Sequence, residues 1–234
     1  MSAVLLFLAV VFSVGGWWLA RQRLMSKPWL ETGLAGITPR TEAVRLPAAK
    51  LGLGVFLVVV GALFALFFSA YFMRMELPDW RTLAMPHILW LNTAMLVLGS
   101  AAMQCAAVDA RRDRRPALRY DLIAAGVATL FFLVGQALAW QNIAAQGYFA
   151  TSNPASGFFY LITGVHGLHM AGGLVALGRT TIHAWRSGDS DRLRTGTELC
   201  AIYWHFMLLV WLLIVALLSG WMNAFADICR QLIA

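Results

Sequence analysis

Four ionisable side chains stand out because they fall inside long apolar stretches of the sequence or directly beside one. His166 and His169 are three residues apart and therefore share one face of a helix. Glu198 and His205 are seven residues apart, two helical turns, and share one face of the next apolar segment. At 1.5 Å per residue, two antiparallel helices bring His169 and His205 to about the same depth. The sequence therefore predicts a polar seam between these two segments, made of His166, His169, Glu198 and His205.

Three kinds of chemistry are compatible with such a seam. Facing transmembrane histidines can ligate haem, but two b-type haems need two pairs, and here His205 stands alone while His87 and His183 fall near segment ends. The paired histidines and Glu198 could also hold a metal ion, although no further carboxylate or cysteine gathers around them. The third interpretation is structural, with hydrogen bonds that fix helix packing or hold a lipid head group. We adopt it, and predict no catalytic residue and no metal site.

The segments that carry these residues are predicted to span a membrane. Hydrophobic residues make up 60% of the 234 residues, charged residues make up 12%, and the mean hydropathy is +0.71, which excludes a soluble globular protein. Six apolar runs can each cross ~30 Å of hydrocarbon. They are Ser2 to Ala20, Leu51 to Met73, His87 to Val108, Leu122 to Asn142, Gly157 to Leu177 and Leu199 to Met222. The predicted fold class is all-α, a polytopic membrane bundle with six transmembrane helices.

The basic residues predict the orientation of this bundle. Fifteen of the 18 lysines and arginines fall in alternate connections, residues 21–50, 109–119 and 178–198. Positively charged connections stay in the cytoplasm, so both termini are predicted to face outside, on the periplasmic side of a bacterial-type plasma (inner) membrane. The same distribution explains the net charge of +7 and indicates no nucleic-acid partner.

Three regions follow from this division of the chain. Residues 1–24 are predicted to be an N-terminal transmembrane anchor. We expect it to be retained and not removed as a signal peptide, because basic residues follow the apolar run and the sequence has no signal-peptidase cleavage site there. Residues 25–49 are predicted to be a cytoplasmic connecting arm, and residues 50–234 a five-helix domain. The tetrapeptide Thr151-Ser152-Asn153-Pro154 has the N-cap and turn chemistry expected at the start of the fifth span.

Several sequence blocks resemble, in order, subunit III of the haem-copper respiratory oxidases, the third core subunit of cytochrome c oxidase. The blocks are Lys50-Leu51-Gly52, Phe68-Ser69-Ala70-Tyr71, Leu89-Trp90-Leu91-Asn92-Thr93-Ala94, Ser152-Asn153-Pro154, residues 158–169, Glu198, Tyr203-Trp204-His205-Phe206 and Trp211. The resemblance covers about residues 50–222. It implies an α-helical protein that binds phospholipid in a cleft between two groups of helices and packs on subunit I.

The chain departs from the family pattern at two carboxylates and at its N-terminus. Val60 stands where family members commonly carry a glutamate, and Leu208 stands where the pattern after Tyr203-Trp204-His205 has an aspartate. A single predicted span precedes the shared five helices, whereas seven-helix members have two. The chain thus looks like a divergent member, and no proton-related role of those carboxylates is carried over to it.

The resemblance implies an accessory, redox-inactive subunit of a terminal cytochrome c oxidase. Haem and copper would lie in partner subunits I and II, cytochrome c would donate electrons, and oxygen reduction would be coupled to proton translocation. This chain would bind no cofactor other than phospholipid, and would stabilise subunit I. The alternatives are a subunit III-like component of a quinol oxidase or nitric oxide reductase, a haem-binding membrane electron carrier, or a transporter.

Four further residues join the predicted lipid-binding or structural set. Trp140, Trp204 and Arg179, near predicted helix ends, are candidate lipid head-group contacts or ordinary interfacial anchors. Tyr203 adjoins Trp204 and belongs to the block that resembles the family.

Overall fold

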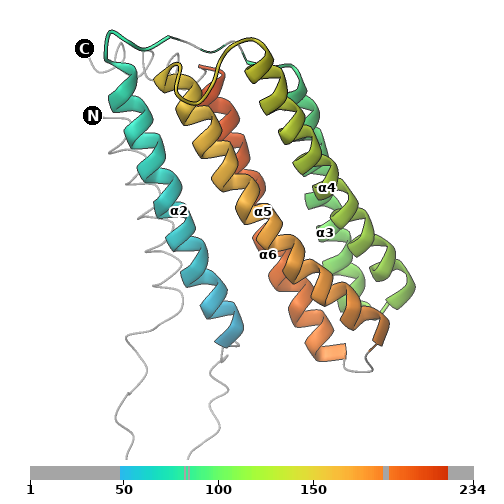
Figure 1. Cartoon of the computed structure of the whole chain (residues 1–234). Helices are drawn as coiled ribbons and strands as arrows, with labels where there is room; N and C mark the ends of the chain where they lie inside the picture. Colours follow the sequence, from blue (N-terminus) through green and yellow to red (C-terminus); the bar gives the residue numbers. More distant parts are fainter. Residues whose placement is uncertain (1–47, 82, 84, 187–189, 221–234) are drawn as a thin grey trace, which may run out of the picture. The chain divides into compact units, whose positions relative to one another are not determined.

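The computed structural model describes residues 48–81, 83, 85–186 and 190–220. The predicted first span, Ser2 to Ala20, lies outside the described residues, as does the predicted arm over 25–49 apart from its last two residues. The described part is all-α, and five of its helices are long and apolar enough to cross a membrane. They are α2 (Ala48–Met75), α3 (Ile88–Arg111), α4 (Arg115–Ala145), α5 (Pro154–Arg186) and α6 (Ser190–Leu218) (Figure 1).

These five helices overlap the second to sixth predicted spans and extend beyond most of them at one or both ends, although α6 ends at Leu218, before the predicted end of the sixth span at Met222. Most of the extensions include polar or charged residues, because a helix can continue past the apolar core of its span wherever arginine and other good helix formers follow. α5, for example, continues to Arg186, nine residues past the predicted end at Leu177. Between α3 and α4 the chain turns at Asp113, which has a φ of +54°, a conformation that aspartate tolerates better than most residues.

The chain divides into two compact units, residues 1–60 and 61–234, and α2 crosses the boundary between them. In the first unit the described residues, 48–60, are helical. In the second unit α3 packs against α4 and α6, and α5 also packs against α4 and α6 (Figure 1).

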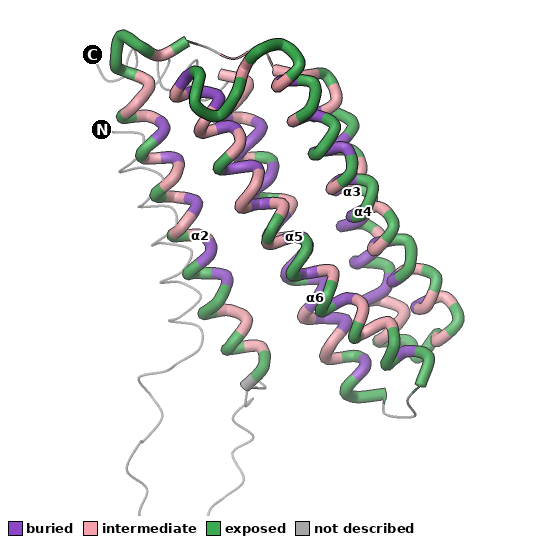
Figure 2. The backbone as a smooth tube through the Cα atoms, in the orientation of Figure 1, coloured by how far each residue is buried: buried purple, intermediate pink, exposed green. Residues whose placement is uncertain are grey.

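Buried and exposed positions both occur along each helix of the second unit (Figure 2), and large apolar residues are found at both kinds of position. Phe132, Phe159 and Trp211 are at most 1% exposed and form part of the interior. On the outer faces, Phe131 and Leu168 are 63% and 71% exposed. Apolar surface of this extent is costly in water and favourable in hydrocarbon, so the exposed faces agree with membrane-spanning helices.

Three hydrogen bonds of one kind connect neighbouring helices. In each, an indole nitrogen donates to a threonine Oγ1 at 3.0 Å: Trp140 to Thr163, Trp204 to Thr129, and Trp211 to Thr93. Each threonine hydroxyl in turn donates to the carbonyl four residues earlier, in Phe159, Ala125 and Leu89 respectively. The hydroxyl thus accepts and donates at once, and α4 is linked to α5, α6 to α4, and α6 to α3.

The α3–α4 and α5–α6 connections lie at the same end of the second unit. Arg119 Nε donates to the carbonyl of Ala184 at 3.0 Å, and an Arg115 guanidinium nitrogen donates to Ser190 Oγ at 2.8 Å. Two of the three connections predicted to be cytoplasmic are therefore together in space. The side of the membrane that they face remains a prediction.

Candidate functional site

Glu198 links α6 to α3. Its carboxylate accepts a hydrogen bond from Arg111 Nε at 3.0 Å, and Arg194 Nε lies 3.5 Å from the same oxygen. The Glu198 side chain is 11% exposed and that of Arg111 is 57% exposed, so the pair lies at the rim of the helix contact. Such a pair fixes the register of two helices, because a mostly buried carboxylate is costly without its cation.

His205 also points to α3. Its Nδ1 is hydrogen-bonded to the hydroxyl of Ser100, and its Nε2 lies 3.0 Å from Oε1 of Gln104. Together with the Trp211–Thr93 bond and the Glu198–Arg111 pair, these contacts follow the whole length of the α3–α6 contact. We call this row the α3/α6 polar seam; it consists of Thr93, Ser100, Gln104 and Arg111 in α3, and Glu198, His205 and Trp211 in α6.

His166 lies in an aromatic environment inside the second unit. The side chain is fully buried, and its ring centroid is 5.1 Å from that of Trp211, 5.6 Å from Phe132 and 6.2 Å from Phe64. Within the described residues neither of its ring nitrogens has a hydrogen-bond partner. An imidazole enclosed by three rings contributes shape and packing to this core.

His169, one turn further along α5, is partly exposed and bonds locally. Its Nδ1 lies 2.8 Å from the carbonyl oxygen of Val165, and its ring centroid is 5.9 Å from that of Phe64 in α2. The hydroxyl of Tyr203 in α6 donates to the backbone carbonyl of His169 at 2.7 Å. The α5–α6 contact at this level therefore uses Tyr203 and the main chain of α5.

The four residues of the predicted seam are thus divided between two places, which corrects the prediction of one seam between the fifth and sixth spans. Glu198 and His205 do share a helix face, as their spacing predicts, but that face meets α3. His166 and His169 have ring contacts with Phe64 of α2, and His166 also has a ring contact with Trp211 of α6. Residue spacing shows which side chains share a face of a helix, and it carries no information about the neighbour that the face meets.

The remaining predicted residues occupy three different environments. Trp204 is 1% exposed and hydrogen-bonded to Thr129 of α4. Its indole therefore lies between helices, inside the bundle, and does not face lipid. Trp140 is partly exposed and bonded to Thr163. Arg179 is exposed near the C-terminal end of α5.

The sequence-based analysis missed a buried amide pair between α3 and α4. Asn92 Nδ2 donates to Gln136 Oε1 at 3.2 Å, and the two side chains are 1% and 2% exposed. A Cβ atom on Gly135 would lie 2.1 Å from Asn92 Oδ1, so the pair needs glycine at that position. The sequence does contain a sign of this pair, since Asn92 and Gln136 each interrupt a run of apolar residues.

Asn153 has the predicted capping role and a second role that was not predicted. Its Oδ1 accepts from the backbone N–H of Ala155 at 3.3 Å, which caps the N-terminus of α5. The same side chain donates to the Arg81 carbonyl and accepts from the Arg81 N–H. The loop before α3 is thus attached to the start of α5.

An ion pair follows α2 in the same loop. Both terminal guanidinium nitrogens of Arg74 donate to the carboxylate of Asp79. Those hydrogen bonds, together with the positive charge of Arg74, lower the pKa of the Asp79 carboxyl below its ordinary value.

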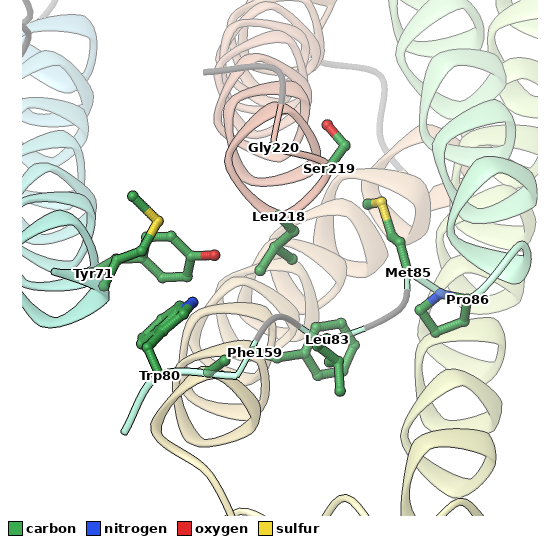
Figure 3. A pocket seen from close by; sticks show the side chains of 11 residues that line it. Tyr71, Trp80, Leu83, Met85, Pro86, Phe159, Leu218, Ser219 and Gly220 are labelled. Atoms are coloured by element: carbon green, nitrogen blue, oxygen red, sulfur yellow. The ribbon is translucent and has the colours of Figure 1, made fainter. Parts of the chain in front are cut away.

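A cavity of about 160 Å³ lies where the C-terminal ends of α2 and α6 meet the start of α5 (Figure 3). Its lining presents both polar and apolar surface and includes Tyr71, Trp80, Met85, Phe159 and Leu218. The Tyr71 and Trp80 rings meet edge-to-face at 4.9 Å and close one side. A cavity of this kind accommodates an apolar group.

No group of three or more histidine, cysteine, aspartate or glutamate side chains is placed to hold a metal ion among the residues that the structure describes. The polar groups at membrane depth in the α3/α6 polar seam connect helices.

Comparison with known proteins gives one consistent result. The family model described as cytochrome c oxidase subunit III matches residues 5–223. A cytochrome c oxidase subunit 3 from Thermostichus vulcanus is 30% identical over 175 residues, which cover 72% of this chain and 85% of that protein. The corresponding Synechocystis protein is 27% identical over 172 residues, covering 71% and 72%.

Mycobacterial relatives match over a shorter region. A protein of Mycobacterium tuberculosis H37Rv named "Probable cytochrome c oxidase subunit 3" is 32% identical over 120 residues. That alignment covers 51% of this chain and 59% of the mycobacterial protein.

Proposed function

This chain belongs to the cytochrome c oxidase subunit III family, and on that premise we propose that it is an accessory, redox-inactive subunit of an aerobic respiratory oxidase in a bacterial plasma membrane. In that complex, subunits I and II carry haem and copper, cytochrome c supplies electrons, and oxygen is reduced as protons are moved. The observation that carries the proposal is the family match over residues 5–223.

The contacts of the described helices support a structural role beside subunit I. Tryptophan–threonine bonds, the Asn92–Gln136 pair and the Glu198–Arg111 pair connect adjacent helices into one body. Interhelical hydrogen bonds and close packing hold membrane helices together, since lipid is as apolar as the helix surfaces. A body of this kind, apolar on its outer faces, can cover the flank of a catalytic subunit in the bilayer.

The proposed phospholipid site uses the cavity beside Tyr71 and Phe159. Its volume of about 160 Å³ is close to that of apolar cavities of ~150 Å³ that bind benzene, which suits the end of an acyl chain. Arg81, in the loop that lines the cavity, is exposed and supplies a positive charge for a head-group phosphate. Both features support the proposal that this chain binds phospholipid.

The function is tested by purifying the native complex in mild detergent and identifying its chains and metals. We expect oxidase subunits I and II to co-purify with this chain, and all haem and copper to remain with them when this chain is removed. A b-type haem spectrum from this chain alone, or a purified chain without oxidase subunits, would overturn the proposal. A quinol-oxidising or nitric oxide-reducing complex would replace the cytochrome c oxidase assignment.

The lipid site is tested by native mass spectrometry of the complex. Met85→Trp places a larger side chain at the cavity from a loop position, and should reduce retained phospholipid by about one molecule per complex. Met73→Trp is the matched control, because Met73 is 73% exposed on α2 and does not line the cavity. Equal lipid retention in both variants would contradict this location.

A further inference from the structure

Two hydrogen-bond donors without an acceptor point into the cavity at the ends of α2 and α6. Figure 3 shows the hydroxyl of Tyr71 and the ring nitrogen of Trp80 directed toward the space between the lining residues. Tyr71 is 8% exposed, so its hydroxyl has little access to water. In the part of the chain that the structure describes, neither Tyr71 Oη nor Trp80 Nε1 has a hydrogen-bond partner. Buried donors without an acceptor are costly, so the cavity favours a molecule that brings an oxygen.

The two donors are held in fixed positions. The ring of Tyr71 meets that of Trp80 edge-to-face at 4.9 Å, and the ring of Phe158 lies 5.7 Å from the first and 6.2 Å from the second. The chain beside Trp80 is attached to the start of α5, because the Asn153 side chain accepts from the Arg81 N–H and donates to the Arg81 carbonyl. The site is therefore preorganised, which lowers the entropic cost of binding.

The rest of the lining suits an uncharged group. None of the 11 described residues that line the cavity has a charged side chain. The Ser219 hydroxyl donates to the carbonyl of Ala216 at 3.1 Å and is used within its own helix turn. A volume of about 160 Å³ holds a group about the size of benzene, and the cavity is partly open. The occupant that fits is a neutral carbonyl whose apolar chain leaves through the open side.

The cavity lies at the depth where phospholipids carry their ester groups. Tyr71 is four residues before Met75, the last residue of α2, which is about 6 Å along the helix. The predicted apolar run ends between them, at Met73. Tyr71 and Trp80 are thus at the edge of the hydrocarbon, where tyrosine and tryptophan are enriched in membrane proteins. Ester carbonyls lie at this edge, between the acyl chains and the head group.

This chain itself offers few other acceptors at the cavity. Three residues adjoin the lining in sequence and lie outside the described residues, and of Thr82, Ala84 and Trp221 only Thr82 has a side-chain oxygen. A diacyl phospholipid brings two ester carbonyls for the two donors. The exposed Arg81 adds a positive charge for the phosphate that follows the ester groups.

We propose that the cavity binds the ester end of a phospholipid acyl chain, with Tyr71 Oη and Trp80 Nε1 donating hydrogen bonds to the ester carbonyl oxygens. The proposal rests on the proposed function, because it deepens the lipid site described there. It goes beyond that site by naming the chemical group that is recognised and the two donors that recognise it. A lipid with ether linkages has the same chains and head group but no carbonyl.

Competition between ester and ether lipids tests this recognition. The native complex is exchanged into vesicles that contain equal parts of a diacyl phosphatidylglycerol and its dialkyl ether analogue, then purified, and the retained lipids are extracted and quantified by mass spectrometry. We expect several-fold more ester than ether lipid to be retained. Equal retention of the two lipids would overturn the proposal, and it is the result expected if Thr82 supplies the acceptor.

Conservative variants test the two donors. Tyr71→Phe and Trp80→Phe each remove one donor and keep an aromatic ring, and each should reduce the ester preference toward equal retention. Tyr120→Phe, at a position of α4 that is 75% exposed and does not line the cavity, is the matched control and should keep the preference of the wild type. Comparison with the wild type cancels lipid held elsewhere in the complex. An unchanged preference in both donor variants would overturn the proposal.

Failure of the ester recognition is distinguishable from failure of the proposed function. Oxidase subunits I and II that co-purify with the wild-type chain support the proposed function, whatever the ratio of ester to ether lipid. Reduced lipid retention in Met85→Trp, combined with equal retention of ester and ether lipids in the wild type, would keep the location of the lipid site and reject the ester recognition.

Discussion

The indole nitrogen of Trp204 donates to the hydroxyl of Thr129 across 3.0 Å, and this bond joins α6 to α4 inside the bundle. Both side chains are almost completely buried, at 1% and 0% exposed. The Thr129 hydroxyl also donates to the Ala125 carbonyl at 2.8 Å, so it accepts one hydrogen bond and donates another. Neither water nor lipid can replace the acceptor at this position.

Thr129→Val should therefore destabilise the bundle. The change keeps the side-chain shape but leaves the indole donor buried without an acceptor, which costs about 1–3 kcal/mol. Thr181→Val is the control, because among the described residues the Thr181 hydroxyl bonds to the carbonyl of Leu177 on its own helix and to no other helix. Unfolding in mixed micelles, followed by circular dichroism, measures the difference. Equal stability of the two variants would show that the Trp204–Thr129 hydrogen bond does not contribute to stability.

Glu198→Gln should weaken the contact between α3 and α6. It removes the charge that pairs with Arg111, and the expected loss is about 1–2 kcal/mol, below the ~3–5 kcal/mol of fully buried pairs, since Arg111 is 57% exposed. The same substitution at the exposed Glu76 is the control and should have little effect. Denaturation in mixed micelles compares the variants, and a Glu198→Gln chain as stable as wild type would refute this role.

Gly135→Ala and Gly172→Ala should have opposite effects on stability. A Cβ at Gly135 would overlap Asn92 Oδ1 and break the bond to Gln136, at a cost of about 1–3 kcal/mol. At Gly172 nothing lies within 4 Å, so alanine should stabilise the helix by up to ~1 kcal/mol. Adding Asn92→Ala should make Gly135→Ala better tolerated. Loss of stability in both single variants would contradict the structure around Gly135.

His166→Leu should preserve stability, and no haem should be lost from the complex. An apolar side chain removes two buried ring nitrogens that have no partner among the described residues, and such replacements are nearly neutral or stabilising. Thermal unfolding and the haem absorption spectrum of the purified complex measure the two effects. A smaller haem signal per complex would revive the interpretation of this histidine as a ligand.

The Arg74–Asp79 pair should make the loop after α2 sensitive to acid. Arg74 favours the ionised form of Asp79 and lowers the pKa of its carboxyl, so the pair contributes above the ordinary aspartate pKa of about 3.9. That contribution disappears as the pH falls through the lower pKa of the folded chain. NMR titration of a ¹³C-labelled carboxyl should place the Asp79 midpoint below 3.9, and Arg74→Gln should raise it. Arg81→Gln, the control, should leave the midpoint unchanged.

Much of the helical organisation could be predicted from local sequence patterns. The second to sixth apolar runs coincide with α2 to α6, because hydrocarbon requires every spanning backbone to satisfy its hydrogen bonds internally. Asn153 before Pro154 predicted the start of α5, and the spacing of Glu198 and His205 predicted their common face. In each case the deciding groups lie within two helical turns of one another.

Only the tertiary structure decided which faces meet. The seven-residue spacing of Glu198 and His205 is compatible with contact to any neighbouring helix, and it is the packing of α6 on α3 that gives them Arg111 and Ser100. Asn92 and Gln136 likewise meet across 44 positions of sequence, because Gly135 leaves room for the amide. Composition and periodicity act along one chain segment and determine helices, depth and faces. Partners are chosen by close packing between segments distant in sequence, where small differences in side-chain volume decide which surfaces fit.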